Sequence, residues 1–180
     1  MIYSPREDSF LLQRNLKHYV KGKSVLDIGS GSGILAEAAL KNKASSVTAS
    51  DIDNNAIKLL KNKFQNTSKI KVIKSDLFSN IKSKFDVILF NPPYLPQDAR
   101  EDKESSIITT GGKHGDELTL KFLKQAKSHL NKNGIILLIT SSLTFQERIL
   151  NLIKKLKFTS RVIDSQKLFM EELELLEIRN

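Results

Sequence analysis

The apolar positions of this chain follow two alternating patterns, one typical of buried strands and one of amphipathic helices. Short apolar runs such as Val25–Ile28 and Phe85–Phe90 are bounded by glycine, proline or polar residues, as buried parallel strands are. The segments between them have helical spacing and good helix formers. The pattern predicts strands at 25–28, 46–50, 70–73, 85–90, 135–140, 160–163 and 173–178, and helices at 8–19, 34–40, 53–64, 118–130 and 144–156.

This alternation predicts βαβ units and therefore an α/β, Rossmann-like fold, with a mostly parallel sheet covered by helices on both faces. A chain of 180 residues without repeats or linker-like composition is expected to form one domain, 1–180. Within it we expect residues 1–20 to form an N-terminal helical extension. A polar loop at 95–115 interrupts the alternation on the substrate side, and its length and polarity suggest mobility.

Ligands of such sheets bind where the strands end, and the first strand ends in a glycine-rich loop. The loop reads Asp27-Ile28-Gly29-Ser30-Gly31-Ser32-Gly33, and its glycines let the backbone turn sharply and approach a ligand. The spacing differs from that of dinucleotide-binding loops, and the Asp27 carboxylate would repel a pyrophosphate. The loop, with Gly29, Gly31 and Gly33, suits a ligand with an ammonium group and no phosphate, such as S-adenosylmethionine.

Two further acids follow the second and third strands. Asp51 is placed to accept both hydroxyls of a ribose, and Asp76 to meet an adenine amino group with Leu77 against the ring. Each acid alone is more often a helix cap or a turn residue, and Asp53 is the residue expected to cap the helix that follows. Three acids in order, each after a strand, favour a cofactor site more strongly than any one does.

The fourth strand runs directly into Asn91-Pro92-Pro93-Tyr94, which two prolines make a rigid turn. The Asn91 side chain and the Pro92 carbonyl provide two hydrogen-bond acceptors, and Tyr94 provides a face for packing a planar group. Two fixed acceptors can hold both hydrogens of an NH2 group and aim its lone pair at a methyl carbon. Such alignment can contribute up to about 7–11 kcal/mol. The turn alone leaves open an amide, an adenine and a guanine as the acceptor.

The composition adds limited information. The chain contains no cysteine, which excludes disulfides and thiolate zinc sites, and no convincing metal cluster is formed by His18, His114 and His129. His114 is expected to be solvated. A net charge of +9 and a pI near 9.6 make contact with nucleic acid or the ribosome a possibility, although lysine-filled solvent faces explain the charge equally well. The absence of a long apolar run or a signal-like start predicts a cytoplasmic protein without membrane contact.

Two further stretches narrow the choice of acceptor. Tyr3–Leu12 resembles the start of the short archaeal and eukaryotic branch of the HemK-type glutamine methyltransferases, and Gly111–Gly115 resembles the segment that follows their Asn-Pro-Pro-Tyr turn. The resemblance implies a class I methyltransferase fold, with seven strands and a reversed last strand. It implies that the acceptor is the glutamine of a Gly-Gly-Gln motif in a translation release factor, with N5-methylglutamine and S-adenosylhomocysteine as products. The site residues it implies are Ser9, Asp27, Gly29, Asp51, Asp76 and Leu77 for the cofactor, and Asn91 and Pro92 for the amide.

The resemblance also implies a partner. The sequence is similar to the branch that works with a small zinc-binding activator, and we expect it to act without the N-terminal substrate-recognition domain of the bacterial members. The third strand, Ile70–Lys74, is expected at a sheet edge, where the activator could add a strand; the alternative is that its lysines only protect an unpaired edge. Three alternatives stay open: methylation of an exocyclic amine of RNA or DNA (adenine N6 or guanine N2), protein lysine methylation, and a non-catalytic binding module.

Overall fold

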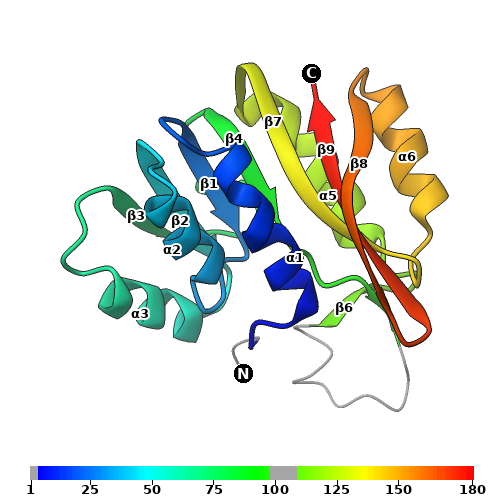
Figure 1. Cartoon of the computed structure of the whole chain (residues 1–180), viewed down its shortest axis with the longest axis horizontal. Coiled ribbons are helices and arrows are strands. Elements are labelled where there is room, and N and C mark those ends of the chain that lie inside the picture. The colour runs from blue at the N-terminus through cyan, green and yellow to red at the C-terminus, as the bar shows by residue number, and fades with distance from the viewer. Residues whose placement is uncertain (1–3, 98–108) are drawn as a thin grey trace.

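One sheet organises the computed structural model, which describes residues 4–97 and 109–180 (Figure 1). Seven strands of the described chain form it, in the order β3-β2-β1-β4-β7-β9-β8. All neighbouring strands are parallel except β9, which is antiparallel to both β7 and β8, so the predicted sheet with a reversed last strand is confirmed. The strands are β1 (Ser24–Ile28), β2 (Ser46–Asp51), β3 (Ile70–Lys74), β4 (Phe85–Phe90), β7 (Leu130–Ser141), β8 (Thr159–Leu168) and β9 (Glu171–Arg179).

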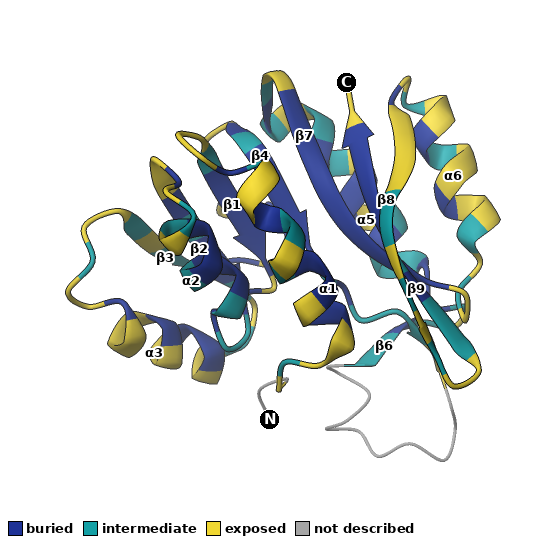
Figure 2. Cartoon of the chain, viewed as in Figure 1, coloured by how far each residue is buried: buried dark blue, intermediate teal, exposed yellow. Residues whose placement is uncertain are grey.

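Helices cover both faces of this sheet, as predicted. On one face Leu12, Ala39 and Leu60 from three helices belong to one buried cluster, and on the other Phe122 and Ile153 belong to a second. Figure 2 shows the buried side of each helix turned toward the sheet and the exposed side toward solvent. The helices are α1 (Glu7–Asn15), α2 (Ile34–Lys41) and α3 (Asn54–Lys63) on the first face, and α5 (Glu117–Ala126) and α6 (Gln146–Lys155) on the second, with single 3-10 turns η1 (Leu16–His18) and η2 (Lys127–His129).

Several predicted element boundaries were wrong, and tertiary pairing explains the main one. The helix predicted at 118–130 ends at Ala126, because Leu130 pairs with Phe85 in the sheet and is the first residue of the twelve-residue strand β7. The helix predicted at 8–19 becomes a 3-10 turn after Asn15. The strand predicted at 160–163 extends to Leu168, because the whole of β8 pairs with β9.

The polar segment 95–115 contains two short strands that the sequence pattern did not predict. β5 (Leu95–Pro96) and β6 (Thr110–Gly112) pair as a separate two-stranded sheet. The remainder of this loop, 98–108, on which the expected mobility chiefly depends, lies outside the described residues, as does Tyr3 of the N-terminal motif.

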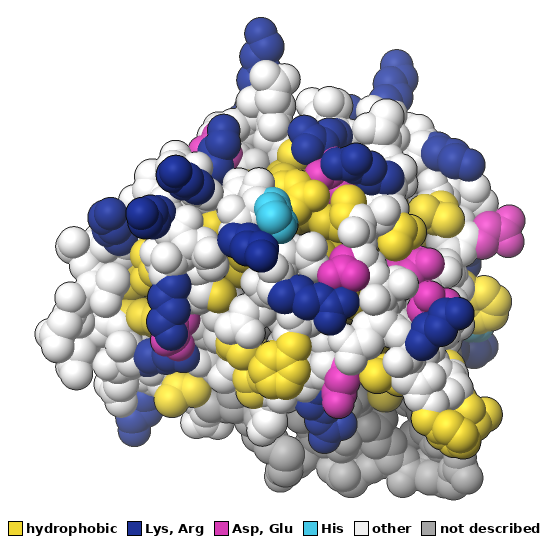
Figure 3. Space-filling view, in the orientation of Figure 1, with side chains coloured by type: hydrophobic (Ala, Val, Ile, Leu, Met, Phe, Trp, Pro, Cys, Tyr) yellow, Lys and Arg dark blue, Asp and Glu magenta, His cyan; other side chains and the backbone are white. Residues whose placement is uncertain are grey.

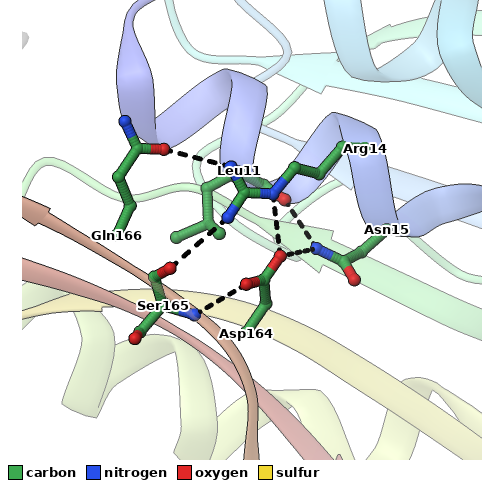
Figure 4. Close-up of polar contacts among 6 residues, drawn as sticks. All are labelled: Leu11, Arg14, Asn15, Asp164, Ser165 and Gln166. Atoms are coloured by element: carbon green, nitrogen blue, oxygen red, sulfur yellow. Dashed lines mark hydrogen bonds and ion pairs between the residues drawn. The ribbon is translucent and has the colours of Figure 1, made fainter.

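The expected N-terminal helical segment contains α1, and this helix packs into the fold. Arg14 Nε donates to Asp164 Oδ2 over 2.8 Å, and Asn15 Nδ2 donates to the same oxygen over 2.7 Å (Figure 4). The Arg14 guanidinium lowers the pKa of Asp164 to about 2. These bonds join the carboxyl end of α1 to β8, and the amino end of α1 lies beside the carboxyl ends of the central strands.

Candidate functional site

A cavity of about 850 Å³ opens at the carboxyl ends of the first four strands. Its wall is built from the loops after β1, β2, β3 and β4, from the amino end of α1, and from the adjoining ends of β8 and β9. A volume in this range suits a small-molecule ligand. The cavity brings together most of the residues that the sequence predicted for a site: Ser9, Gly29, Gly31, Asp51, Asp76, Leu77, Asn91, Pro92, Pro93 and Tyr94.

The glycine loop forms one wall of the cavity. Gly29 has φ +68° and Gly31 has φ +49°, a left-handed conformation that glycine adopts without steric cost. A Cβ atom added at Gly29 would meet nothing within 4 Å, so the backbone there borders open space. Gly33 is different, because its added Cβ would lie 2.7 Å from Leu60 Cδ2, and it does not line the cavity. Gly33 therefore permits close packing of α2 on α3, and the structure gives it no ligand contact.

Asp27 lies beneath this loop and not in the cavity wall. Its side chain is buried, and neither carboxyl oxygen has a hydrogen-bond partner. Burial raises the pKa of Asp27 to about 7; the Ser30 hydroxyl and the Ala36 amide lie near the carboxyl group without bonding to it, and they counteract this only in part. The carboxyl group is therefore close to half-ionised at neutral pH. A cationic ligand above the loop would favour its ionised form.

Asp51 connects the second strand to the glycine loop. Its Oδ2 accepts from the Gly31 amide over 2.9 Å, and its Oδ1 accepts from the Asp53 amide over 2.9 Å. A carboxylate has about four acceptor positions, so two are still available to hydroxyl groups of a ligand. Asp53 itself accepts from the Asn55 amide at the start of α3, which confirms it as the helix cap.

Asp76 and Leu77 form the wall after the third strand. Asp76 Oδ2 pairs with Lys121 Nζ at 2.9 Å, and both side chains are about half exposed. Exposed pairs of this kind contribute about 0–1 kcal/mol, so the carboxylate can turn toward a ligand at little cost. Leu77 is 6% exposed and has φ +47°, with its carbonyl fixed by the Ser75 hydroxyl over 2.8 Å. This geometry places an apolar side chain on the cavity wall.

Asn91 lines the same cavity and carries a buried, unsatisfied acceptor. Its Nδ2 donates to Ser9 Oγ over 3.4 Å, and Ser9 Oγ donates to Asp8 Oδ1 over 3.2 Å. This chain of bonds orients the Asn91 amide and leaves its Oδ1 buried without a hydrogen-bond partner. A buried acceptor in that condition costs about 1–3 kcal/mol, which a donor on a ligand would recover. Asp8 is a site residue that the sequence reasoning missed, although it lies within the N-terminal motif.

The glycines at 111–115 lie directly against the Asn-Pro-Pro-Tyr turn. A Cβ atom added at Gly111 would lie 2.6 Å from the Pro93 carbonyl oxygen, and one added at Gly115 would lie 2.3 Å from the Tyr94 carbonyl oxygen. Both distances are too short for any side chain, so only glycine allows this segment to pack against the turn. The two motifs that the sequence showed separately therefore form one structural unit.

His114 was expected to be solvated, and the structure corrects this. It is partly buried, its ring meets the Phe145 ring edge-on at 5.0 Å, and its amide donates to Glu117 Oε2 over 3.1 Å. It does not line the cavity. Across residues 4–97 and 109–180, no three histidine, aspartate or glutamate side chains gather as metal ligands would. Within the same ranges no helix has the length and apolarity to cross a membrane.

Comparison with known proteins adds the decisive observation. The family described as "Methyltransferase small domain" matches residues 7–169. The chain belongs to this family. It is a methyltransferase, and S-adenosylmethionine is the methyl donor of enzymes with this fold.

Three similar proteins share most of its length. A candidate protein N5-glutamine methyltransferase of Methanocaldococcus jannaschii is 41% identical over 175 residues, covering 96% of this chain and 88% of that protein. The eRF1 methyltransferase catalytic subunit mtq2 of Schizosaccharomyces pombe is 28% identical, covering 98% of this chain and 88% of that protein. The Mtq2–Trm112 complex of E. cuniculi contains a chain that superposes with a TM-score of 0.79 over 99% of this chain and 98% of that one, at 22% identity, which establishes the fold.

The methyltransferase cavity has one wall that the sequence reasoning missed entirely. Leu168, Glu171 and Leu173 line it from the hairpin of β8 and β9, more than seventy residues after the Asn-Pro-Pro-Tyr turn. Glu171 Oε1 accepts from the Ser141 hydroxyl over 2.7 Å, which fixes this side chain to the end of β7. No local motif marks these residues, because only the sheet order brings them to the cavity.

Proposed function

We propose that this methyltransferase transfers a methyl group to the side-chain amide nitrogen of a glutamine in a translation release factor. The observation that carries the proposal is the buried Asn91 Oδ1, which lacks a hydrogen-bond partner at the wall of the cavity. An acceptor there fits a donor NH2 group. The name of the relative from M. jannaschii supports a glutamine, and that of the eRF1 methyltransferase subunit from S. pombe supports a release factor.

The cavity suits S-adenosylmethionine as methyl donor. Its lining contains six acidic residues and one basic residue among the described part of the chain, which favours a ligand with an amino group and no phosphate. We assign the ribose hydroxyls to the free acceptor positions of Asp51, the adenine to Asp76 and Leu77, and the amino acid end to Gly29, Gly31 and Ser9. Asp27 lies beneath the glycine loop, from where its ionised carboxylate attracts the ammonium group of the ligand. When bound, the cofactor supplies an electrophilic methyl carbon on a sulfonium.

The Asn-Pro-Pro-Tyr turn then acts on the acceptor. Asn91 Oδ1 and the Pro92 carbonyl each accept a hydrogen bond from one N–H of the glutamine amide. Tyr94 and Pro93 pack against the plane of that amide. Holding both N–H groups opposes delocalisation of the nitrogen lone pair and directs it along the line of displacement. No general base is needed before transfer, because the methylated nitrogen becomes acidic only once it is cationic.

A nucleic-acid acceptor fits the charge of the cavity poorly. Nucleic-acid binding requires basic side chains against phosphates, whereas the lining is acidic. Exposed lysines instead lie around the amino ends of the strands, at the opposite end of the sheet from the cavity, and in Figure 3 dark blue side chains gather along the upper rim of the molecule. The acids of the lining are Glu7, Asp8, Asp51, Asp53, Asp76 and Glu171, beside the single base Arg6. The lysines around the amino ends of the strands include Lys21, Lys23, Lys43, Lys84, Lys132 and Lys157.

We also propose that a small zinc-binding protein pairs with the open edge of β3. The position of β3 at the sheet edge confirms the predicted strand order, and the fold neighbour from E. cuniculi forms a complex with Trm112. Residues 1–180 would act as one domain beside this partner, since a single sheet extends from β1 to β9.

The edge of β3 allows a direct test of this pairing. Lys69 O accepts from β2, and Ser75 N donates to β2, at the two ends of the strand. Because backbone groups alternate in direction along a strand, the N–H of Val72 points to the open edge. Val72→Pro should therefore keep the fold and weaken partner binding at least about tenfold, whereas Val72→Ala, which keeps the N–H, should bind normally. Equal binding by both variants would exclude pairing along this edge.

The function is tested by separating cofactor binding from turnover. Asn91→Ala should keep its affinity for S-adenosylmethionine, measured by calorimetry, while methylation of a release factor falls by about 100-fold or more. Asp51→Ala should weaken the cofactor affinity instead. A large loss of cofactor affinity in Asn91→Ala would show that Asn91 is not the acceptor clamp.

A further inference from the structure

The hairpin that joins β8 to β9 ends in two apolar residues that point into solvent. Phe169 is 94% exposed and Met170 is 81% exposed, the two highest values among the large hydrophobic residues of the described chain. The strands pair up to Leu168 and Glu171, so these two residues form the whole connection. Figure 3 shows hydrophobic side chains at the lower right, where Figure 1 places this hairpin tip.

Both residues are unusual for a two-residue hairpin connection. Such turns favour Gly, Asn and Asp, because these residues adopt positive φ or bond to the backbone. Met170 has φ +61°, a conformation that residues with long side chains rarely adopt. Glycine or asparagine would be more stable there and would expose no apolar surface. Phe169 and Met170 therefore make a less stable turn than glycine or asparagine would, and they expose apolar surface. An exposed apolar surface of this kind is typical of an interaction site.

The tip is held in a fixed position beside the cavity mouth. Its two flanking residues, Leu168 and Glu171, line the cavity, and Glu171 is bonded to Ser141 at the end of β7. The next residue, Glu172, is bonded through its amide to the Ser142 hydroxyl over 2.9 Å, and its carbonyl accepts from the Ser142 amide over 2.9 Å. A group that enters the cavity thus belongs to a molecule that passes close to Phe169 and Met170.

We infer that Phe169 and Met170 form a docking tip for the protein that carries the methylated glutamine, and this inference rests on the proposed function. The cavity itself holds the cofactor and the amide, so a small acceptor would need no surface outside it. A folded protein acceptor, in contrast, continues beyond the mouth, where the tip offers it an aromatic and a thioether side chain. Aromatic residues and methionine are enriched at the centres of protein interfaces. The tip binds an apolar patch of the acceptor protein near its target glutamine.

The inference is tested with two acceptors of different size. The double variant Phe169→Ser, Met170→Asn removes the apolar surface, and its asparagine tolerates the left-handed conformation. With an intact release factor, kcat/KM should fall by about tenfold or more through a raised KM. With a short peptide that contains Gly-Gly-Gln, kcat/KM should stay within about twofold of the wild type, as should the affinity for S-adenosylmethionine. Val162→Ser, which changes an exposed apolar residue within β8 and away from the tip, should alter neither reaction.

The docking tip and the proposed glutamine methylation are refuted by different results. Equal losses with protein and peptide, or no loss with either, would overturn the docking tip while leaving the glutamine reaction in place. Loss of self-association or of activator binding by the double variant, with unchanged kinetics on the intact factor, would assign the tip to a different occupant and overturn the inference. Wild-type protein that methylates neither acceptor would instead refute the proposed function, and the docking tip with it.

Discussion

Replacing Asp27 by asparagine should stabilise the protein at alkaline pH and weaken its cofactor binding. The Asp27 carboxyl group is buried without a hydrogen-bond partner, and burial raises its pKa from 3.8 to about 7. The folded protein therefore prefers the neutral acid, whereas the unfolded chain ionises near pH 4. Stability is highest when both states are protonated, and it falls as the pH rises from about 4 to 7, because the unfolded state then releases a proton that the folded state keeps.

The magnitude follows from the difference between the two pKa values. One pKa unit corresponds to about 1.36 kcal/mol, so a shift from 3.8 to about 7 lowers the free energy of unfolding by about 4 kcal/mol above pH 7. Between pH 5 and pH 8 the loss from Asp27 is about 3 kcal/mol. Asparagine resembles the neutral acid in shape and does not ionise, so Asp27→Asn should lack this decline.

Urea denaturation of wild type and Asp27→Asn at several pH values between 5 and 8.5 measures the effect. The quantity to follow is the difference in free energy of unfolding between the two proteins. A packing change caused by the amide adds the same amount to this difference at every pH, so only the ionisation of Asp27 makes the difference vary with pH. This difference should grow in favour of the variant by about 3 kcal/mol from pH 5 to pH 8. A difference that stays constant across this range would refute the reasoning, since Asp27 would then ionise normally in the fold.

The same residue predicts how cofactor binding depends on pH. A ligand with an ammonium group above the glycine loop favours ionised Asp27, so the affinity of the wild type for S-adenosylmethionine should decrease as the pH falls below about 7. Asp27→Asn should bind more weakly at pH 8 and show little dependence on pH. Calorimetry across this range checks both statements. If the affinities of the two proteins depended on pH in the same way, the ionisation of Asp27 would not be coupled to ligand binding.

Further predictions concern the packing around the site. Gly111→Ala would bring a Cβ atom to 2.1 Å from the Gly115 carbonyl oxygen. We therefore expect thermal unfolding to show a stability loss of about 1–3 kcal/mol, and steady-state kinetics to show a lower kcat. Wild-type turnover by this variant would show that the packing of Gly111 does not support the Asn-Pro-Pro-Tyr turn. Asp164→Asn should cost about 0.2–1 kcal/mol at pH 7, because the pair with Arg14 is partly exposed. The folded pKa of Asp164 is about 2, so that cost should shrink as the pH falls from about 4 toward 2, and a cost that persists at pH 2 in urea titrations would argue against the ion pair.

The sequence predicted the sheet and most of its functional edge for a clear physical reason. Buried parallel strands appear as short apolar runs, and their carboxyl ends meet at one edge, so acids and glycines that follow strands can be grouped before a structure is known. Asp51, Asp76 and the Asn-Pro-Pro-Tyr turn were found in this way, and all of them line the cavity.

The sequence could not reveal features that depend on three-dimensional contacts. Gly33 belongs to the same loop as Gly29, but its hydrogen atom faces α3 and the cavity lies elsewhere. Asp27 was expected at the cofactor site beside the glycine loop, and only packing shows that it is buried beneath that loop. The hairpin residue Glu171 reaches the cavity because β9 lies between β7 and β8, an order that no local pattern encodes.

The most direct test of the account is to identify the atom that receives the methyl group. The protein, with its activator where one is required, is incubated with labelled S-adenosylmethionine and an equal mixture of release factor and total RNA, and the products are separated and analysed by mass spectrometry. The account predicts one added methyl group on the side-chain nitrogen of the Gly-Gly-Gln glutamine, and none when Asn91→Ala is used. Label on an RNA base, or on a lysine of the factor, with that glutamine unmodified would contradict it.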